Sequence, residues 1–300
     1  MIDPTDPLWQ LSTAIAERAA SMRGAVAAIR IAEERHRTGM LWQPDLVVAS
    51  EQSLPRREAF EVAIAGRAPI AANVVGRDRG TNVALLQLPE PVPLAPRIAG
   101  NAPAGTLALA FGADEAAEVT VRVGVVNFVG PPWHSHAGGR IDARIALDMR
   151  IARSEEGGPV LDAAGACLGM TTLGPAAQVL VIPVATLERI VPMLLKEGRV
   201  SRGWLGVALQ PVAVPDALQS QAGQASGLMV MSIADASPAA KAGIVAGDIV
   251  VTVNGTPARR LRGVATHLGA ESIGREADLR VIRGGTILSL KATIEARPAA

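Results

Sequence analysis

Two fragments of the sequence carry residue types whose spacing could support chemistry. His134 and His136 stand at alternate positions, which in an extended segment would place both imidazoles on one side, as metal binding requires. Glu155 and Glu156 are adjacent carboxylates, and a carboxyl pair with separated pKa values can act as acid and base. Neighbouring side chains usually point apart, however, and two histidines do not complete a metal site. We therefore expect an exposed polar loop at the histidines and a solvated turn at the glutamates.

Other reactive residues point to no further site. Glu51 could join the two glutamates in an acidic cation site, but the sequence does not guarantee the several converging oxygens that a hard cation needs. His36 and His267 lack metal-like spacing and are expected at the surface. The single Cys167 excludes an internal disulfide and a cysteine zinc site. We expect no metal ion and no cofactor.

The composition excludes several classes of protein. With 300 residues, 49% of them hydrophobic, the chain can form two or three domains with cores of their own. Its formal charge of +1 is too small to attract the chain electrostatically to nucleic acid or to an anionic membrane, so neither is expected as a partner. No apolar window reaches the length of about 18 residues that a membrane span needs. The first residues are acidic and lack the regions of a secretory signal, which predicts a cytoplasmic protein.

Hydrophobic periodicity predicts a β-rich body after an N-terminal helix. Apolar positions at helical spacing predict a helix over residues 7–22. Short β-type runs separated by Gly, Pro and Asp then continue to about residue 185, a pattern typical of a barrel or sandwich. The expected strands are 25–32, 46–49, 60–65, 82–88, 107–111, 119–127, 145–151, 167–172 and 179–183.

A helix and a linker separate this body from a second domain. Thr186 is expected to cap the helix and Gly198 to end it, while Pro192 should kink the helix or delay its start. The periodicity begins afresh after residues 200–204. We therefore expect an N-terminal helical segment, a β domain and a smaller C-terminal domain, over residues 1–22, 23–199 and 200–300.

The C-terminal domain has its own helix and turn signals. Ser237 is a helix N-cap followed by a proline at the first helical position. Asn254-Gly255 and Gly284-Gly285 are hairpin turns. A second helix is expected over 259–268, and the final strands over 277–282 and 287–294.

These strings resemble one known family. Arg202-Gly-Trp-Leu-Gly-Val207, Gly227-Leu-Met-Val230 and the segment 237–248 closely resemble the PDZ domain of HtrA/Deg proteins. Earlier strings, 107–112 and 157–161, resemble the protease domain of the same family. The resemblance spans about residues 20–297 and implies a mainly β protein, a trypsin-like double β-barrel followed by a small α+β PDZ domain.

The resemblance also locates the family's catalytic positions, and all three are substituted. A serine protease uses an imidazole base, a carboxylate that orients it and a hydroxyl nucleophile. Gln52 stands at the His position, Asn82 at the Asp position and Glu156 at the Ser position, while Ser154 replaces the oxyanion-loop glycine. Neutral amides cannot act as the base, and a carboxylate would repel the developing oxyanion. We expect the two amides to hydrogen-bond to each other and the domain to be a pseudoprotease.

The PDZ resemblance implies a peptide groove. Such domains bind an extended peptide as an added strand and hold its terminal carboxylate with backbone N–H groups of a Gly-containing loop. The apolar face of a helix usually packs in the hydrophobic core. The alternative interpretation is therefore that the helix residues of this domain belong to its core and do not line a groove. An arginine run beside the helix, Arg259, Arg260 and Arg262, could favour acidic C-termini, although a solvated basic face is the default. The implied groove residues are Trp204, Leu205, Gly206 and Val207 on the loop and edge strand, and Leu261, Val264 and Leu268 on the helix.

The main hypothesis is a catalytically inactive HtrA-like adaptor that binds protein or peptide C-termini through its PDZ domain and its vestigial cleft. The first alternative is an active HtrA-like serine endopeptidase or quality-control factor, and the second is a metal-binding protein on the same scaffold with His134 and His136 as ligands. The family resemblance further implies a homotrimer, to which Leu8, Trp9 and Leu11 would contribute.

Overall fold

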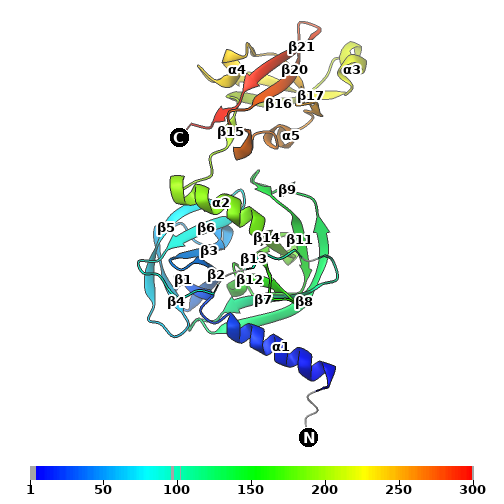
Figure 1. Cartoon of the computed structure of the whole chain (residues 1–300). Coiled ribbons are helices and arrows are strands. Elements are labelled where there is room, and N and C mark those ends of the chain that lie inside the picture. Colours follow the sequence, from blue (N-terminus) through cyan, green and yellow to red (C-terminus); the bar gives the residue numbers. More distant parts are fainter. Residues whose placement is uncertain (1–4, 96–97, 102, 299–300) are drawn as a thin grey trace. The chain divides into compact units, whose positions relative to one another are not determined.

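The computed structural model describes residues 5–95, 98–101 and 103–298, and these form a mainly β protein as predicted (Figure 1). The chain divides into two compact units, Met1–Val200 and Ser201–Ala300. The three-part division expected from the sequence, with a separate segment 1–22, stays a prediction. Within the described residues, no helix has the length and apolar character needed to cross a membrane.

The first unit contains two closed barrels of antiparallel strands. The first barrel has the order β1-β2-β3-β6-β5-β4 and the second β11-β14-β13-β12-β7-β8. A short pair, β9 with β10, stands apart from them. The bounds of the strands are β1 Val26–Ala32, β2 Arg35–Gln43, β3 Leu46–Ser50, β4 Ala59–Ile64, β5 Ile70–Asp78, β6 Val83–Gln87, β7 Leu107–Ala113, β8 Val119–Gly130, β9 Trp133–His134, β10 Arg140–Ile141, β11 Arg144–Asp148, β12 Pro159–Asp162, β13 Cys167–Leu173 and β14 Val179–Pro183.

The sequence analysis did not predict three barrel strands, β2, β5 and β12, because they lack a continuous apolar run. β2 begins with polar Arg35, His36 and Arg37, and only its second half is fully buried. β5 alternates between exposed and buried positions, and β12 follows directly on two glycines. Barrel closure supplies the backbone partners of these strands even where their side chains are polar.

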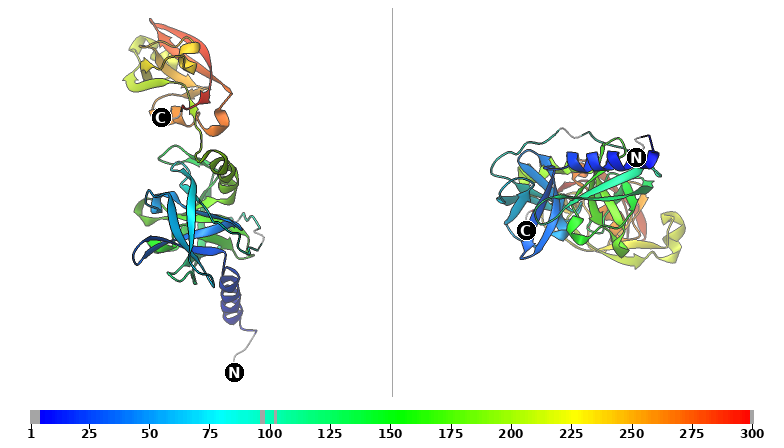
Figure 2. Two further views of the ribbon diagram at one scale, coloured as in Figure 1. Left: turned by 90° about the vertical axis from the view of Figure 1, so that its left-hand side faces the viewer. Right: turned by 90° about the horizontal axis from the view of Figure 1, so that it is seen from below.

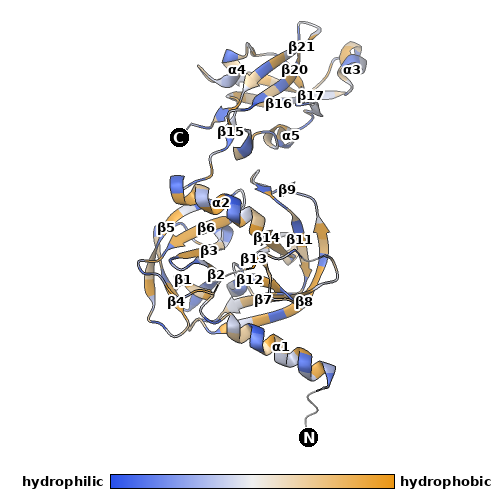
Figure 3. Cartoon of the chain, in the orientation of Figure 1, coloured by the Kyte–Doolittle hydropathy of each residue, from blue (hydrophilic) through white to orange (hydrophobic). Residues whose placement is uncertain are grey.

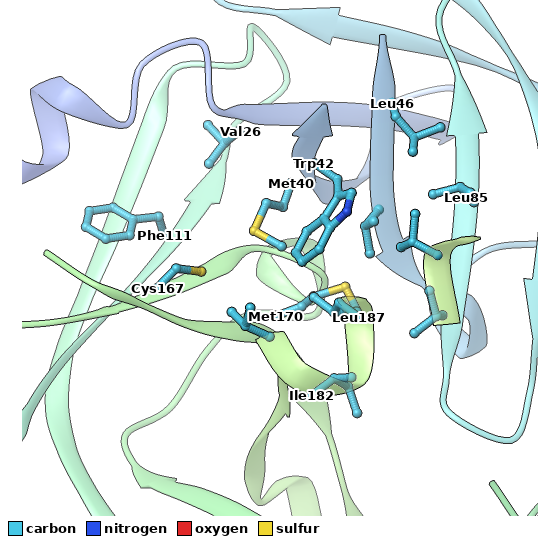
Figure 4. Close-up of a cluster of buried hydrophobic side chains, with 14 of the residues drawn as sticks. Val26, Met40, Trp42, Leu46, Leu85, Phe111, Cys167, Met170, Ile182 and Leu187 are labelled. Atoms are coloured by element: carbon cyan, nitrogen blue, oxygen red, sulfur yellow. The ribbon is translucent and has the colours of Figure 1, made fainter. Parts of the chain in front are cut away.

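A shared hydrophobic core joins the two barrels to helix α2, Val184–Glu197. Met40 and Trp42 come from the first barrel, Phe111 and Met170 from the second, and Leu187 from the helix (Figure 4). Each barrel also has an apolar interior of its own. Figure 3 shows apolar colours along the strands of both barrels. Together these cores hold the facing ends of the barrels in a fixed arrangement.

Helix α2 begins before the expected cap. Thr186 lies within the helix and donates its hydroxyl to Asp142 at 2.9 Å, so the predicted capping role is wrong. The start is set instead by Pro183 at the N-cap, and the helix continues through Pro192. Gly198 ends it with a left-handed φ of 68°, as predicted.

Helix α1, Pro7–Ser21, confirms the N-terminal helix prediction. The Asp6 carboxylate caps it by accepting a hydrogen bond from the Leu8 N–H at 2.8 Å. Its C-terminal part packs Ile15 and Ala19 on the shared core, whereas its first half extends away from the barrels (Figures 1 and 2). The helix therefore leaves apolar side chains near its start exposed, among them Trp9.

The second unit is a sheet of order β16-β17-β18-β20-β21 with short helices, and β16 forms one edge. Ser237 caps α4 through the Ala240 N–H, as predicted. Both residues of the Asn254-Gly255 turn have positive φ, which confirms the hairpin signal. The bounds are β15 Gly203–Trp204, β16 Val207–Ala213, α3 Asp216–Ala222, β17 Ser226–Ile233, α4 Pro238–Lys241, β18 Ile249–Val253, β19 Thr256–Pro257, α5 Leu261–Ala265, β20 Glu276–Arg283, β21 Thr286–Thr293 and β22 Glu295–Ala296.

Candidate functional site

The first barrel brings Gln52 and Asn82 together at the junction of the two barrels. β3 ends at Ser50, and a single 3-10 turn then carries Gln52. β6 begins directly after Asn82 and pairs with β3, so both residues lie at the same barrel end. The Gln52 backbone N–H donates to Asn82 Oδ1 at 2.7 Å. The contact between the two amide residues thus runs from backbone to side chain, whereas we expected it between the two amide side chains.

The second barrel supplies a buried carboxylate to the same place. Glu156 follows the 3-10 turn Arg153–Glu155 and is 5% exposed. Its Oε1 accepts hydrogen bonds from Gln52 Nε2 at 2.6 Å, Ser50 Oγ at 2.8 Å, Thr172 Oγ1 at 3.1 Å and the Leu173 N–H at 3.2 Å. We call these four donors, together with Asn82, the Glu156 network.

The proton directions within the Glu156 network are internally consistent. Asn82 Nδ2 donates to Ser50 Oγ at 2.9 Å and to Thr172 Oγ1 at 2.7 Å. Both hydroxyls therefore accept from an amide and direct their own protons to the carboxylate. Gln52 Nε2 also donates to the Leu173 carbonyl at 2.9 Å, so the N–H and C=O of Leu173 are both occupied. The buried carboxylate of Glu156 therefore has its hydrogen-bonding capacity satisfied by donors from both barrels.

The positive charge facing this carboxylate comes from Arg37. Burial lowers the pKa of the Arg37 guanidinium, and the negative charge of Glu156 opposes that shift. The Nε atom of Arg37 is buried and has no hydrogen-bond partner among the described residues. Arg37 therefore acts on Glu156 through its charge, while the amides and hydroxyls supply the hydrogen bonds.

Glu155 has a different role from its neighbour, and the expectation of a solvated turn is wrong for both. Its side chain is 6% exposed and accepts from Arg122 Nε at 3.0 and 3.1 Å, from Thr120 Oγ1 at 3.0 Å and from the Ala152 N–H at 2.7 Å. The two carboxylates are thus buried on separate partners. Glu155 fixes the turn that carries Ser154 and Glu156 to strand β8.

Potential metal ligands do not come together in the described part of the chain. No three or more His, Cys, Asp or Glu side chains there form a group that could hold a metal ion. Glu51 forms an ion pair with Arg77, with 3.9 Å between Glu51 Oε1 and an Arg77 guanidinium nitrogen, and does not join the two glutamates in a cation site. His134 lies in β9 and pairs with Arg140 across the ladder. His136 is exposed in the following loop.

The other two histidines differ from the surface prediction. His36 is half-buried, with Nε2 at 2.9 Å from the Ala113 carbonyl. His267 is half-buried with an Nε2 that has no hydrogen-bond partner among the described residues, and burial lowers its pKa. The sequence offered no signal for the burial of either histidine, because burial depends on packing against residues that are not adjacent in the chain.

In the second unit, the predicted loop precedes the edge strand. Gly206 adopts a left-handed φ of 78°, and a Cβ there would collide with Ser237 at the start of α4. The Leu205 and Gly206 carbonyls accept from Ala239 N at 2.9 Å and Ala234 N at 2.8 Å. Two carbonyl anchors and a glycine without space for a side chain hold this loop in one conformation.

The three predicted helix residues of the groove are in different environments. Val264 is 5% exposed and belongs to the core, as the alternative interpretation held. Leu268 is half-buried against that core, and its carbonyl accepts from the Gly203 N–H at 2.9 Å. Leu261 is 50% exposed, so it alone among the three presents a largely free apolar surface.

The geometry of both units agrees with comparisons to known proteins. The chain matches a trypsin-like peptidase domain over residues 37–170 and a PDZ domain over residues 203–294. The chain is of the HtrA and DegP type. A probable periplasmic serine endoprotease DegP-like of Brucella suis biovar 1 (strain 1330) is 29% identical over 262 residues, covering 84% of this chain and 50% of the relative. The similarly named protein of Rhizobium meliloti (strain 1021) is 30% identical, covering 76% and 46%.

Solved structures of HtrA type share the fold of the whole chain. The HtrA-type protease AlgW with a decapeptide has a TM-score of 0.71 at 20% identity and covers 95% of this chain and 99% of that one. The serine endoprotease from Yersinia pestis has a TM-score of 0.67 at 22% identity and covers 95% and 98%. In contrast, this HtrA-type chain spans about half the length of the two curated relatives described above.

The relatives correct one expectation. They are named periplasmic proteins, so the prediction of a cytoplasmic protein is wrong. That prediction rested only on the composition of the first residues, and a short terminal stretch does not determine the compartment of a folded domain.

Proposed function

We propose that this HtrA-type chain is a non-catalytic protein that binds peptide C-termini in its PDZ groove. The observation that carries the proposal is the Glu156 network, in which a buried carboxylate takes the position that the family resemblance gives to the nucleophile. The hydroxyls of Ser50 and Thr172 are hydrogen-bonded to that carboxylate, and no histidine among the described residues hydrogen-bonds to either hydroxyl.

The chemistry of acyl transfer argues for inactivity. A nucleophile needs a base within hydrogen-bond reach, and the group in that place is the Gln52 amide, which is a donor to Glu156. A carboxylate at position 156 opposes the negative charge of a tetrahedral intermediate. When such a triad is removed, the remaining hole and binding surfaces accelerate hydrolysis only about 10³- to 10⁴-fold over water. Such a rate is negligible for a peptide bond.

The architecture of the second unit supports peptide binding. β16 is an edge strand whose outer side can accept an added strand, and the fixed loop at Gly206 precedes it. Two HtrA-type structures similar in fold are described with a decapeptide and a tripeptide. In contrast, the N–H and C=O of Leu173, at the junction of the barrels, are both occupied internally. The PDZ groove is therefore the better site for a peptide.

The second candidate is an active serine endopeptidase. The names of the curated relatives favour it, since each is called an endoprotease. Activity in this chain would require chemistry other than that of a Ser-His-Asp triad, because positions 52, 82 and 156 carry Gln, Asn and Glu. The two candidates differ in a directly measurable property, the cleavage of an unfolded protein.

The deciding experiment is mass spectrometry of unfolded casein after long incubation with the purified chain. It is run beside Glu156→Ala and beside a triple variant that restores the family residues, Gln52→His, Asn82→Asp and Glu156→Ser. We expect no cleavage by the natural chain or by Glu156→Ala, and any activity to appear only in the triple variant. Cleavage by the natural chain that disappears in Glu156→Ala would overturn the proposal and point to carboxylate chemistry.

A further inference from the structure

Charge is unevenly distributed between the two units. Residues 201–300 contain ten Lys and Arg against seven Asp and Glu, a formal charge of +3, whereas residues 1–200 carry −2. Several of the basic side chains in the second unit are paired with carboxylates: Arg283 with Asp248 at 2.8 Å, Lys241 with Glu295 at 2.6 Å and Lys291 with Glu276 at 3.3 Å. The excess must therefore lie elsewhere on the unit.

Part of that excess is concentrated at the start of α5. Arg259, Arg260 and Arg262 fall within four consecutive positions, and all three are exposed. Among the residues that the structure describes, the side chains of Arg259 and Arg260 form no ion pair or hydrogen bond. Between these cationic side chains lies Leu261, which is half exposed. We call these four residues the arginine edge.

The arginine edge lies at the end of the groove remote from the loop that would hold a carboxylate. The Leu268 carbonyl accepts from the Gly203 N–H, so the C-terminal end of the segment 261–268 lies at the residue that leads into the loop. Helix α5 packs beside β16. Seven residues of mostly helical chain separate Leu268 from Leu261, or about 10 Å at about 1.5 Å per residue.

This separation fixes which part of a ligand the arginines would face. A peptide whose carboxylate sits at Leu205-Gly206 must extend along the edge strand toward Ala213. An extended chain advances about 3.3 Å per residue, so about 10 Å corresponds to about three residues. The arginine edge therefore lies beside the residues from about the third position upstream of the C-terminus.

We propose that the PDZ groove selects peptides with acidic side chains about three or more residues before an apolar C-terminus. This inference rests on the proposed peptide-binding function and names its ligand class. Arginine is suited to carboxylates because its planar guanidinium can donate two parallel hydrogen bonds. The apolar Leu261 between the arginines matches an extended peptide, in which side chains alternate, better than a run of phosphates.

Selection by exposed charges should be modest and dependent on salt. An exposed ion pair contributes little individually, and salt screens it. Two or three such pairs correspond to roughly a three- to tenfold difference in Kd between acidic and neutral peptides. The arginine edge thus determines preference, while the loop and the edge strand determine whether a peptide binds at all.

The test measures fluorescence anisotropy of labelled peptides with the full chain. All peptides end in the same apolar residues and carry Glu, Gln or Lys at the upstream positions, and an amidated copy of the acidic peptide lacks the terminal carboxylate. A single-stranded DNA oligonucleotide serves as a polyanion without a C-terminus. The chains compared are the natural one, Arg259→Gln/Arg260→Gln, the matched control Lys291→Gln at the opposite sheet edge and Gly206→Asp in the loop.

We expect the acidic peptide to bind three- to tenfold tighter than the Gln peptide, and the Lys peptide to bind weakest. The double arginine variant should lose this preference while still binding the Gln peptide, and Lys291→Gln should retain it. Equal affinities for acidic and Gln peptides, both abolished by Gly206→Asp, would overturn the ligand class and leave peptide binding intact. Failure of every peptide would overturn both proposals, and an oligonucleotide that binds more tightly than the acidic peptide would overturn the ligand class.

Discussion

At the scale of single residues, Glu156 combines an ionisable side chain with a buried position. Its carboxylate is buried and collects hydrogen bonds from both barrels. A buried carboxylate without donors would be strongly destabilising, so the surrounding donors compensate for its desolvation. Conversely, the donors depend on Glu156, since several of them are themselves removed from water.

We predict that Glu156→Ala lowers the free energy of unfolding by roughly 2–4 kcal/mol, because it leaves several buried donors without an acceptor. Urea unfolding of the full chain measures the effect. The matched control is Glu118→Ala, which removes an exposed carboxylate paired with Arg23 and should change stability by less than about 0.5 kcal/mol. Equal stability of the two variants would show that the network is not a stabilising element.

At the scale of elements, the segment that follows α5 contains a half-buried histidine, His267. His267 lies in the turn between α5 and Leu268, and burial lowers its pKa. A lowered pKa means that the folded state favours the neutral imidazole. The unfolded chain, with a histidine pKa of about 6.5, therefore binds more protons at mildly acidic pH.

The sign of this linkage gives a pH prediction. The stability of the second unit should be fully present above about pH 6.5 and should fall as the pH drops below that value, because protonation then favours the unfolded state. Thermal unfolding between neutral and mildly acidic pH measures the slope. His267→Gln should reduce the slope, whereas His136→Gln, at an exposed position, should leave it unchanged. An unchanged slope in His267→Gln would contradict the assignment.

The ion pair of Asp248 with Arg283 in the second unit makes stability depend on pH in a lower range. Burial alone would raise the pKa of the Asp248 carboxyl, but the hydrogen bonds and charge of Arg283, together with the Val245 N–H, hold its pKa below the ordinary value. The stability that this pair contributes is present above about pH 4 and is lost as the pH falls further. The two acid-sensitive groups therefore act in separate pH windows.

At the scale of the whole molecule, several large apolar side chains of the first unit are exposed. Leu8 is 76% exposed and Trp9 and Leu11 are each 45% exposed on α1. Strand β8 exposes further apolar side chains, those of Val123, Val125, Phe128 and Val129. Clustered apolar surface of this kind marks interaction sites in soluble proteins.

We predict a homotrimer of the full chain, with α1 at the contact, measured by light scattering. Leu8→Glu/Leu11→Glu should lower the mass toward that of the monomer, because each burial of a carboxylate in an apolar contact is unfavourable. Leu195→Glu, which also adds a charge at an exposed leucine, is the control and should not change the mass. A natural chain that is monomeric would refute the prediction.

The sequence predicted those elements whose signals are local. Strands with continuous apolar runs, the helix ending at Gly198 and the Asn254-Gly255 turn depend on neighbouring residues, and all were found near their expected places. β2 and β5 were missed because barrel closure, a long-range property, pairs their polar segments. Helix α5 is shorter than the apolar spacing predicted, since Leu268 is held by Gly203 outside the helix.

By itself the sequence determined a β-rich body followed by a second, smaller domain, and its resemblance to a known family implied the double barrel, the PDZ domain and the importance of positions 52, 82 and 156. The tertiary structure alone decided what those residues do to each other. Ser50 and Glu156 are 106 positions apart, and their hydrogen bond exists only because the shared core fixes one barrel against the other. No local pattern indicates that one carboxylate oxygen will accept protons from both barrels. The partners of a buried polar group are selected by packing, and packing is a property of the folded chain.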